Sequence, residues 1–395
     1  MIRIFFINII FLNSYYQVNI NSMNIILIFT YGISLKNWEE SGLLSREIKL
    51  YEELHKKYKY KFTFLTFGDD SDINVLKNYE FIDVIPAKSK LKFGSSKIIN
   101  FLKSMYLPFK LKKSLNNIDL IKTNQLNGSW IGIILKLILN KPLFIRTGYD
   151  ILQFKIIEKK PVYIIIFYYL LTQLAILFSD VFSVTSLADK STIQKRFIGT
   201  REILLNRNYI FKVASKPYEK KYSDRIISVG RLEKQKNYIK LLNNLEESEL
   251  QIDIVGEGIQ KEIIDKTYNN KRLKVNFIGP FNNQELIEIY GKYKVFVSAS
   301  MYEGNPKAIL EAMSSGCMVV AFENKNIEEI IENNQNGFIF HDFKDLPNLL
   351  NKIINNKELF ELISKNARET INQNYIFESA ITREVDIYKS LLQNI

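Results

Sequence analysis

Short apolar runs rich in β-branched residues alternate with longer helical stretches along the first half of this chain. The first run, residues 24–30, precedes a stretch over 41–57 whose apolar residues fall near helical spacing. Later runs lie at 61–67, 83–87, 119–123, 142–148 and 180–186, with helical stretches such as 131–139 and 161–179 between them. This alternation predicts a doubly wound parallel sheet.

A second alternation follows a polar stretch, residues 203–224, which contains Asn206, Asn208 and Pro217 and is interpreted as a linker. Strand-like runs then lie at 225–230, 250–258, 273–280, 294–300, 317–323 and 337–341, with helices expected near Asn237, Ile259, Asn283 and Lys307. Two α/β units in one chain predict a cleft between them, where ligands of such domains bind.

The stretch from Pro161 to Ser179 contains no charged residue. As a helix, at ~1.5 Å per residue, it would reach roughly 28 Å, close to a bilayer core of ~30 Å. Thr172 and Gln173 in its middle, and the strand-like run directly after it, argue against a span. A domain with parallel strands on both sides of a helix cannot place that helix across a bilayer. We therefore expect a buried or interfacial helix.

Composition excludes several classes of protein and site. Apolar residues make up 47% of the 395 residues, so a disordered chain is excluded. A single cysteine, Cys317, excludes an intramolecular disulfide framework and zinc sites with several cysteines. The two histidines, His55 and His341, are too few for a histidine-rich metal centre, and we expect neither they nor Cys317 to carry chemistry.

The formal net charge of +12 lies entirely in residues 1–200, which hold 27 basic and 15 acidic residues. Between Lys88 and Lys122 there are nine lysines and one acid, Asp119. Such a surface attracts anions, although a solvated lysine-rich face has the same composition. Few arginines and no zinc-finger or RNA-binding aromatic motif favour an anionic membrane surface over nucleic acid as the partner.

The segment Ser300–Phe322 follows a predicted strand and enters a predicted helix. Gly304, Asn305 and Pro306 predict a tight turn at the helix start, where free backbone N–H groups and the helix dipole favour an anion. Glu303 and Glu311 are eight residues apart, so both carboxylates can share one face and accept from sugar hydroxyls. The alternative is that neither carboxylate binds a ligand. Glu303 would then only stabilise the start of the helix, and Glu311 would lie on a solvated helix face.

A second segment, residues 228–242, places Arg231 after a strand and Lys236 before a helix. Two cations there could converge on a diphosphate leaving group and neutralise charge that builds as a glycosidic bond breaks. Surface charge is the alternative, but cations near a helix start oppose the dipole, which favours an anionic ligand. Gly256 and Gly258 permit a tight turn between a strand and a helix. The turn could bring the backbone close to a phosphate, or the glycines could be needed for the turn alone.

Taken in order, Arg231 and Lys236, the run "VGEG", the run "FIGP" with Gly279, and the Glu303–Glu311 segment resemble family 4 glycosyltransferases of GT-B fold. The resemblance covers about Ile226–Phe340. It implies two Rossmann-like domains with parallel sheets facing a cleft. It also implies retaining transfer from a nucleotide-diphosphate sugar, with no metal or other cofactor.

The resemblance also implies roles for individual residues. Arg231 and Lys236 would hold the diphosphate, Glu311 the ribose, and Glu303 the sugar. The loop formed by Gly304, Asn305, Pro306, Lys307 and Ala308 would supply amides. Gly42 would let an N-terminal loop approach the diphosphate. The alternative is that Gly42 is only a glycine of a loop or helix start, with no ligand.

Three segments are expected along the chain. A short apolar run and a polar stretch precede the first predicted strand, so we expect residues 1–22 to be an extension outside the fold, with Met23 as a candidate start. Residues 23–205 form an acceptor-side domain and residues 206–377 a donor-binding domain. A final helix over about 378–395 would cross back and complete the first domain.

The sequence departs from the family at a histidine that many members carry at a strand end facing the sugar. Neither histidine here is placed for that role. The equivalent region is Arg146–Asp150 or Lys122–Gly128, and we assign Arg146 and Asp150 to the acceptor or the sugar. A local ion pair at a strand end is the alternative for both. Residues Asp70–Asp72 imitate a D-x-D metal motif, but their neighbours indicate a polar turn.

The expected partners are a nucleotide-sugar donor and a glycan or lipid-linked acceptor, at the inner face of the cell membrane. Three alternatives stay open: a nucleotide-sugar epimerase of the same architecture, a non-catalytic nucleotide-sugar-binding protein, and a basic nucleic-acid binder. An epimerase would convert the donor without an acceptor and needs acid/base groups at the sugar carbon. A nucleic-acid binder would show affinity that falls steeply with salt.

Overall fold

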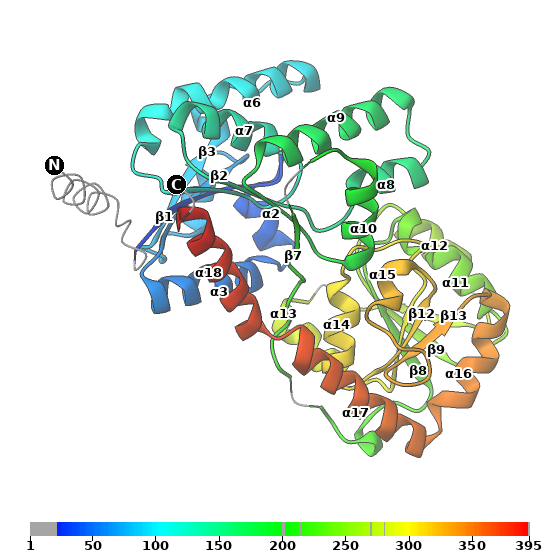
Figure 1. The fold of residues 1–395 in the computed structure, drawn as a ribbon. Helices are drawn as coiled ribbons and strands as arrows, with labels where there is room; N and C mark the ends of the chain where they lie inside the picture. Colours follow the sequence, from blue (N-terminus) through cyan, green and yellow to red (C-terminus); the bar gives the residue numbers. More distant parts are fainter. Residues whose placement is uncertain (1–21, 200–201, 214, 269–270, 280, 394–395) are drawn as a thin grey trace, which may run out of the picture.

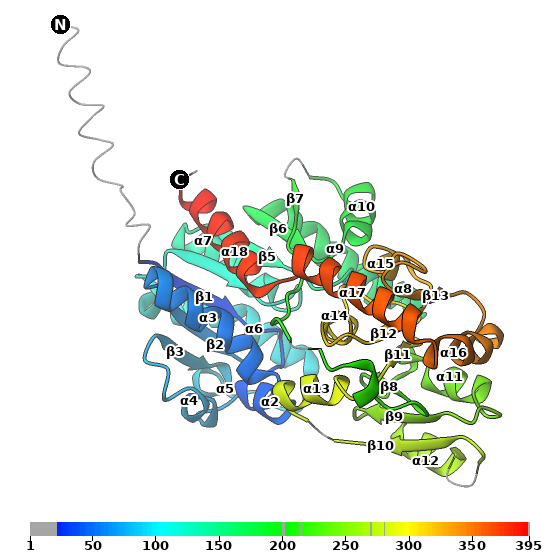
Figure 2. The same ribbon diagram turned by 90° about the horizontal axis from the view of Figure 1, so that it is seen from below.

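The computed structural model describes residues 22–199, 202–213, 215–268, 271–279 and 281–393. The predicted extension, 1–22, lies outside these ranges except for its last residue. The described residues form two parallel sheets with helices on their faces, which lie side by side in Figures 1 and 2.

The first sheet has seven strands in the order β3-β2-β1-β4-β5-β6-β7, all paired in parallel. Its strands are β1 (Asn24–Ile28), β2 (Lys61–Thr66), β3 (Ile82–Pro86), β4 (Leu120–Thr123), β5 (Leu143–Arg146), β6 (Val181–Val184) and β7 (Ile203–Leu205). Its helices are α2 (Leu35–Glu40), α3 (Leu44–Tyr58), α4 (Ser71–Val75), α5 (Ala87–Lys90), α6 (Lys97–Leu111), α7 (Ser129–Leu139), α8 (Ile151–Ile157), α9 (Val162–Phe178) and α10 (Leu187–Arg196).

The second sheet has six strands in the order β10-β9-β8-β11-β12-β13, again all parallel. Its strands are β8 (Arg225–Val229), β9 (Gln251–Val255), β10 (Lys274–Phe277), β11 (Val295–Ser298), β12 (Met318–Phe322) and β13 (Phe338–Phe340). The helices that follow β8 in the chain are α11 (Tyr238–Asn244), α12 (Lys261–Tyr268), α13 (Asn283–Tyr290), α14 (Lys307–Ser314), α15 (Lys325–Glu328), α16 (Leu346–Ile354), α17 (Lys357–Asn374) and α18 (Phe377–Gln393).

The strands form because short β-branched runs are buried on both faces, as parallel sheets between helices require. Ile25, Ile26, Leu27 and Ile28 of β1 are all inaccessible to solvent. One prediction was wrong: residues 203–205 belong to β7 rather than to a linker. Three apolar residues followed by Asn206 and Arg207 are too short a run to show strand periodicity.

The two last helices connect the domains. α17 packs in the core of the second sheet through Ala367 and Ile371, whereas α18 packs in the core of the first sheet. Figure 2 shows the two helices running in succession across both domains. On α18, Glu384 accepts from Lys122 Nζ of β4 at 2.5 Å and from Asn206 Nδ2 at 3.0 Å, so a buried ion pair fixes the helix to the first sheet.

Candidate active site

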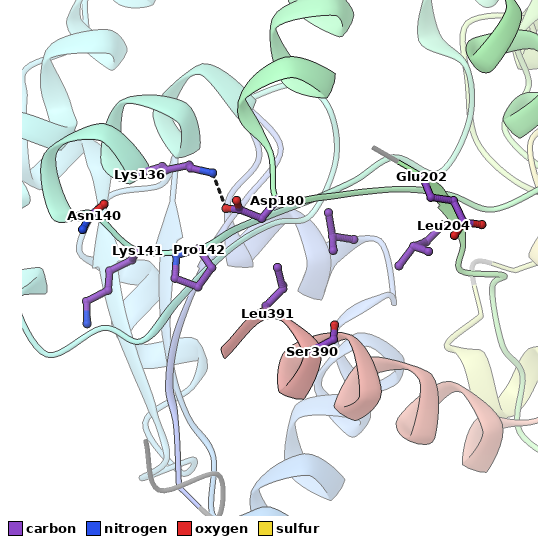
Figure 3. A pocket seen from close by; sticks show the side chains of 10 residues that line it. Lys136, Asn140, Lys141, Pro142, Asp180, Glu202, Leu204, Ser390 and Leu391 are labelled. Atoms are coloured by element: carbon purple, nitrogen blue, oxygen red, sulfur yellow. Dashed lines mark hydrogen bonds and ion pairs between the residues drawn. The ribbon is translucent and has the colours of Figure 1, made fainter. Parts of the chain in front are cut away.

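Two of the cavities lie at opposite ends of the strands of the first sheet. A cavity of about 530 Å³ lies where β5, β6 and β7 begin, beside α18, and is lined by Pro142, Asp180, Leu204 and Ser390 among others (Figure 3). The other, of about 680 Å³, lies between the domains, where β4, β5, β8 and β11 end. Ligands of open α/β sheets bind outside the carboxyl ends of the strands, so the interdomain cavity is the candidate site.

The second domain contributes a helix start to this cavity. Glu303, Gly304, Asn305, Pro306, Lys307 and Ala308 all line it. Pro306 is the residue before α14, and Lys307 is the first residue of the helix. The first N–H groups of a helix have no partner within it, and the dipole is positive at this end. This wall of the cavity is therefore suited to an anion.

Two cations flank that helix start. Lys236 Nζ donates to Glu303 Oε1, and the two side chains are 17% and 10% exposed. Arg231 is 71% exposed and lies 3.3 Å from Glu233, so its guanidinium is free to turn toward a ligand. Arg231, Lys236 and Glu303 all line the cavity, so the structure brings together the three residues that the sequence assigned to diphosphate and sugar.

Gly256 and Gly258 support the loop that carries Arg231 and are not among the residues lining the cavity. A Cβ at Gly256 would lie 2.0 Å from the carbonyl oxygen of Gly230, and one at Gly258 would lie 2.6 Å from that of Leu232. No side chain fits at either position. The structure therefore favours the turn-geometry interpretation of these two glycines.

Three further predicted donor-binding residues lie outside the described cavity wall. Glu311 is buried in α14, where it accepts from Arg46 NH1 of α3 and from Asn283 Nδ2, each at 3.1 Å. Gly42 packs against the backbone of Phe281, and Gly279 follows β10 at the edge of the second sheet. Their assigned roles stay predictions.

Charged residues of α3 bridge the domains at the cavity. Glu47 accepts from Lys307 Nζ at 2.6 Å, and Arg46 Nε lies 3.3 Å from the same carboxylate. Burial acts to raise the pKa of Glu47, but the charges of Lys307 and Arg46 outweigh it and lower that pKa to about 2. Burial and the nearby charge of Arg46 lower the pKa of Lys307 to about 8. The Glu47 carboxylate therefore forms ion pairs with two cations, Lys307 and Arg46, where the two domains meet.

A chain of hydrogen bonds joins Arg146 to the helix start of the second domain. Arg146 NH2 donates to Asn208 Oδ1 at 2.8 Å, and Asn208 Nδ2 donates to the carbonyl oxygen of Asn305 at 2.6 Å. The Asn208 backbone N–H also donates to Asn305 Oδ1 at 3.1 Å. Arg146, at the end of β5, lines the cavity and is connected to the loop opposite it.

Asp150 is not among the residues that line the cavity, and its carboxylate has partners elsewhere in the first domain. It precedes α8, accepts from the Gln153 backbone N–H at 3.0 Å, and forms an ion pair with Arg196 at 3.1 Å. Burial raises its pKa, against the opposing effect of that hydrogen bond and of Arg196. This geometry favours the structural alternative, a local ion pair, and the catalytic role assigned to Asp150 stays a prediction.

The D-x-D-like turn also has a structural explanation. Both carboxylate oxygens of Asp72 accept backbone N–H groups at the start of α2, from Leu35 and Lys36, each at 3.1 Å. Within the described ranges, histidine, cysteine and carboxylate side chains form no group of three that could hold a metal ion. Cys317 is buried in the core of the second sheet, and burial raises the pKa of its thiol to about 11.

Sequence reasoning missed several residues that shape this cavity. Arg46 and Glu47 come soon after Gly42, at the start of the first long helix. In sequence, charged residues that take part in a site cannot be distinguished from charged residues on a solvated helix face. Asn208 lay in the presumed linker. Tyr149, Phe154 and Tyr302 form an aromatic cluster across the domains, with ring centroids of successive pairs 4.4 Å apart. The spacing of aromatic residues along the chain does not indicate this long-range contact.

Comparison with known proteins connects the second domain to a family. Residues 211–370, about two fifths of the chain, match the family of glycosyl transferases group 1. The sulfoquinovosyl transferase SQD2 of Arabidopsis thaliana is 33% identical over 165 residues, 40% of this chain and 32% of its own. The poly(ribitol-phosphate) alpha-N-acetylglucosaminyltransferase of Staphylococcus aureus is 33% identical over 143 residues, 35% of this chain and 28% of its own.

The chain therefore spans about a third or less of the length of these curated relatives. The fold extends further than the sequence match. The crystal structure of Anabaena Alr3699/HepE in complex with UDP-glucose has 17% sequence identity and a TM-score of 0.70, over 93% of this chain and 100% of that chain. This similarity confirms the predicted GT-B fold. Residues 211–370 are therefore similar in sequence to the family of glycosyl transferases group 1, and the fold of the described chain is similar to that of HepE.

Proposed function

We propose that this chain is a retaining, metal-independent glycosyltransferase. It moves a sugar from a nucleotide-diphosphate sugar to a glycan or lipid-linked acceptor at the inner face of the cell membrane. The observation that carries the proposal is the convergence of Arg231, Lys236 and the start of α14 on one interdomain cavity. Two cations and a row of free amides form a binding site for a diphosphate, the leaving group of such a donor.

In the proposed reaction the bond between the anomeric carbon and the diphosphate oxygen breaks. A new bond forms from the acceptor oxygen to the same face of that carbon, and the acceptor proton passes to the leaving diphosphate. Arg231, Lys236 and the α14 amides would stabilise the charge that develops on the diphosphate. Lys236 would exchange its contact with Glu303 for the diphosphate, leaving Glu303 to accept from a sugar hydroxyl.

The first domain would hold the acceptor. Arg146, Asn124 and Gln125 lie at the carboxyl ends of β4 and β5 and face the donor side across the cavity. The ion pair of Lys307 with Glu47 joins the domains at the cavity. Exclusion of water from the cavity would matter because hydrolysis of the donor is the competing reaction. A polymeric acceptor is consistent with the Staphylococcus aureus relative, whose name specifies poly(ribitol-phosphate).

The test is nucleotide-sugar turnover with and without acceptor. The purified chain is given UDP-, GDP- and ADP-sugars in EDTA, together with lipid-linked and soluble oligosaccharide acceptors, and released diphosphate and products are measured. We expect diphosphate release that depends on an acceptor, and a product linkage with the anomeric configuration of the donor.

Other outcomes would contradict the proposal in different ways. Conversion of the donor without an acceptor would indicate an epimerase, and donor binding without turnover on any acceptor would indicate a binding protein. An inverted linkage, or a trapped glycosyl-enzyme adduct, would contradict the same-face displacement.

A further inference from the structure

Two helices of the first domain expose most of their apolar side chains. Along α9, nine apolar residues are between 37% and 72% exposed: Val162, Tyr163, Ile166, Phe167, Tyr169, Leu170, Leu174, Leu177 and Phe178. Along α6, six are between 37% and 74% exposed: Ile98, Ile99, Leu102, Met105, Tyr106 and Phe109. Large exposed apolar patches on a folded domain indicate a surface that binds something.

The two helices form one continuous surface, which we call the α6–α9 face. Phe101 of α6 and Phe167 of α9 are in edge-to-face contact, with ring centroids 5.8 Å apart. Figure 1 shows both helices along the same side of the first domain, with α7 packed against them. Both helices therefore lie on one side of the first domain, and each exposes apolar residues there.

Lysines surround this face. Lys88, Lys90, Lys92, Lys97, Lys110, Lys112 and Lys113 are exposed in and around α6, and Lys159 and Lys160 are exposed at the start of α9. α9 itself has no charged residue. Apolar and aromatic side chains bordered by lysines are typical of surfaces that lie in the interface of an anionic bilayer.

We propose that the α6–α9 face docks on an anionic membrane surface. α9 and α6 would lie in the plane of the interface with their exposed apolar side chains below the headgroups, and the surrounding lysines would contact lipid phosphates. No helix among the described residues is long and apolar enough to cross a membrane. A second copy of the chain fits this face less well, because pairing two such faces would bring two sets of lysines together.

The same surface reaches the rim of the interdomain cavity. α8 packs against α9, and its Ile156 and Ile157 are 42% and 41% exposed. On the same helix and just after it, Phe154, Lys155 and Glu158 line the cavity. A lipid-borne acceptor could therefore pass from the bilayer over α8 into the cavity. This route rests on the proposed function, whereas docking itself requires no donor.

Vesicle flotation of the full chain tests the docking. Vesicles of phosphatidylcholine alone are compared with vesicles in which about a third of the lipid is phosphatidylglycerol. We expect binding to the anionic vesicles only, and weaker binding as salt is raised. The variant with Leu102→Gln, Phe109→Gln, Ile166→Gln and Leu170→Gln should bind more than about ten-fold more weakly. The variant with Lys97→Gln, Lys112→Gln and Lys113→Gln should lose about five-fold per lysine.

Matched controls come from the second domain. Ile263→Gln with Leu362→Gln changes apolar side chains that are 54% and 55% exposed there, and Lys266→Gln with Lys325→Gln and Lys365→Gln removes three exposed lysines. We expect both controls to bind like the unchanged chain. Equal losses in test and control variants, or no flotation of the unchanged chain, would overturn the proposal. A dimer in solution that only the α6–α9 variants dissociate would also overturn it, in favour of a second copy.

A second readout separates this inference from the proposed function. The rise in melting temperature with nucleoside diphosphate should be the same in every variant, because none of the changed residues lines the cavity. Loss of flotation with that rise intact tests docking alone. Flotation without any response to diphosphates would leave docking supported and contradict the donor site.

Discussion

At the scale of single residues, the candidate site is a set of charges shared between domains. Glu47 is paired with Lys307 and Arg46, and Glu311 is paired with Arg46. Glu311 is the residue that the resemblance assigned to ribose, so a ribose there would have to replace or join Arg46. The sequence predicted Glu311 and Lys307 from a local motif. It could not predict Arg46 and Glu47, because a partner more than 250 positions away leaves no local pattern.

The ion pairs of Glu47 predict how the stability of the fold depends on pH. Its pKa is lowered from 4.5 to about 2 in the folded chain by Lys307 and Arg46, against the effect of burial. A carboxylate whose folded pKa is depressed stabilises the fold above pH 4.5, and this stabilisation is lost as pH falls from about 4.5 toward 2. Glu47→Gln should lower the free energy of unfolding at pH 7 by up to about 3 kcal/mol and flatten its dependence on pH in that window.

Urea unfolding at a series of pH values measures this effect. Glu52→Gln is the control, since Glu52 lies on the same helix and pairs with Lys49 at the surface, at 3.4 Å. It should cost less than about 1 kcal/mol. Equal effects of the two substitutions at pH 7 would contradict the assignment of a special role to the Glu47 pair.

At the scale of elements, the site depends on loops that approach each other closely. A Cβ at Gly304 would lie 2.2 Å from the carbonyl oxygen of Gly148, so the loop before α14 and the loop after β5 meet backbone to backbone. Another contact joins the domains at α10, whose first N–H groups, from Leu187 and Ala188, donate to the carboxylate of Glu329. A carboxylate from one domain therefore caps a helix of the other.

This contact predicts the effect of Glu329→Ala. Loss of a carboxylate that accepts two N–H groups at a helix start should cost about 1–2 kcal/mol, because the amides lose their partner and the dipole loses a favourable charge. We expect the melting temperature to fall by a few degrees. Glu328→Ala, the exposed neighbour, should change it by much less. A drop of equal size in both variants would show that the contact with α10 is unimportant.

Elements with a clear period were predictable, and short ones were not. The apolar runs predicted β1, β2, β4 and β5, and all four lie in the first sheet. β7 was missed because its three residues show no period, and α2 and α4 were missed because helices of five or six residues lack a repeated apolar face. The uncharged stretch 161–179 predicted α9, but only the packing of the domain decides which of its sides is buried.

At the scale of the whole molecule, the alternation of strands and helices was sufficient to predict two parallel sheets and a cleft between them. Within the cleft, motifs local in sequence predicted that Arg231, Lys236 and Glu303 lie together, and all three line the cavity. The opposite wall was not predictable in the same way, because Arg146 and Asn208 reach the loop at Asn305 only through packing of the domains. Motif spacing therefore predicted the side chains of one wall, while those of the opposite wall required the fold.

The measurement that tests the central claim most directly is thermal melting of the chain with UDP, GDP, ADP and CMP, with EDTA present. At ~100 times its Kd, a nucleotide should add ~2.7 kcal/mol of stability, which raises the melting temperature visibly. We predict that one diphosphate does so, that Arg231→Ala abolishes the rise, and that Lys234→Ala, an exposed lysine two positions before Lys236, preserves it. Absence of a rise with every nucleotide, or a full rise in Arg231→Ala, would contradict a metal-free diphosphate site in this cavity.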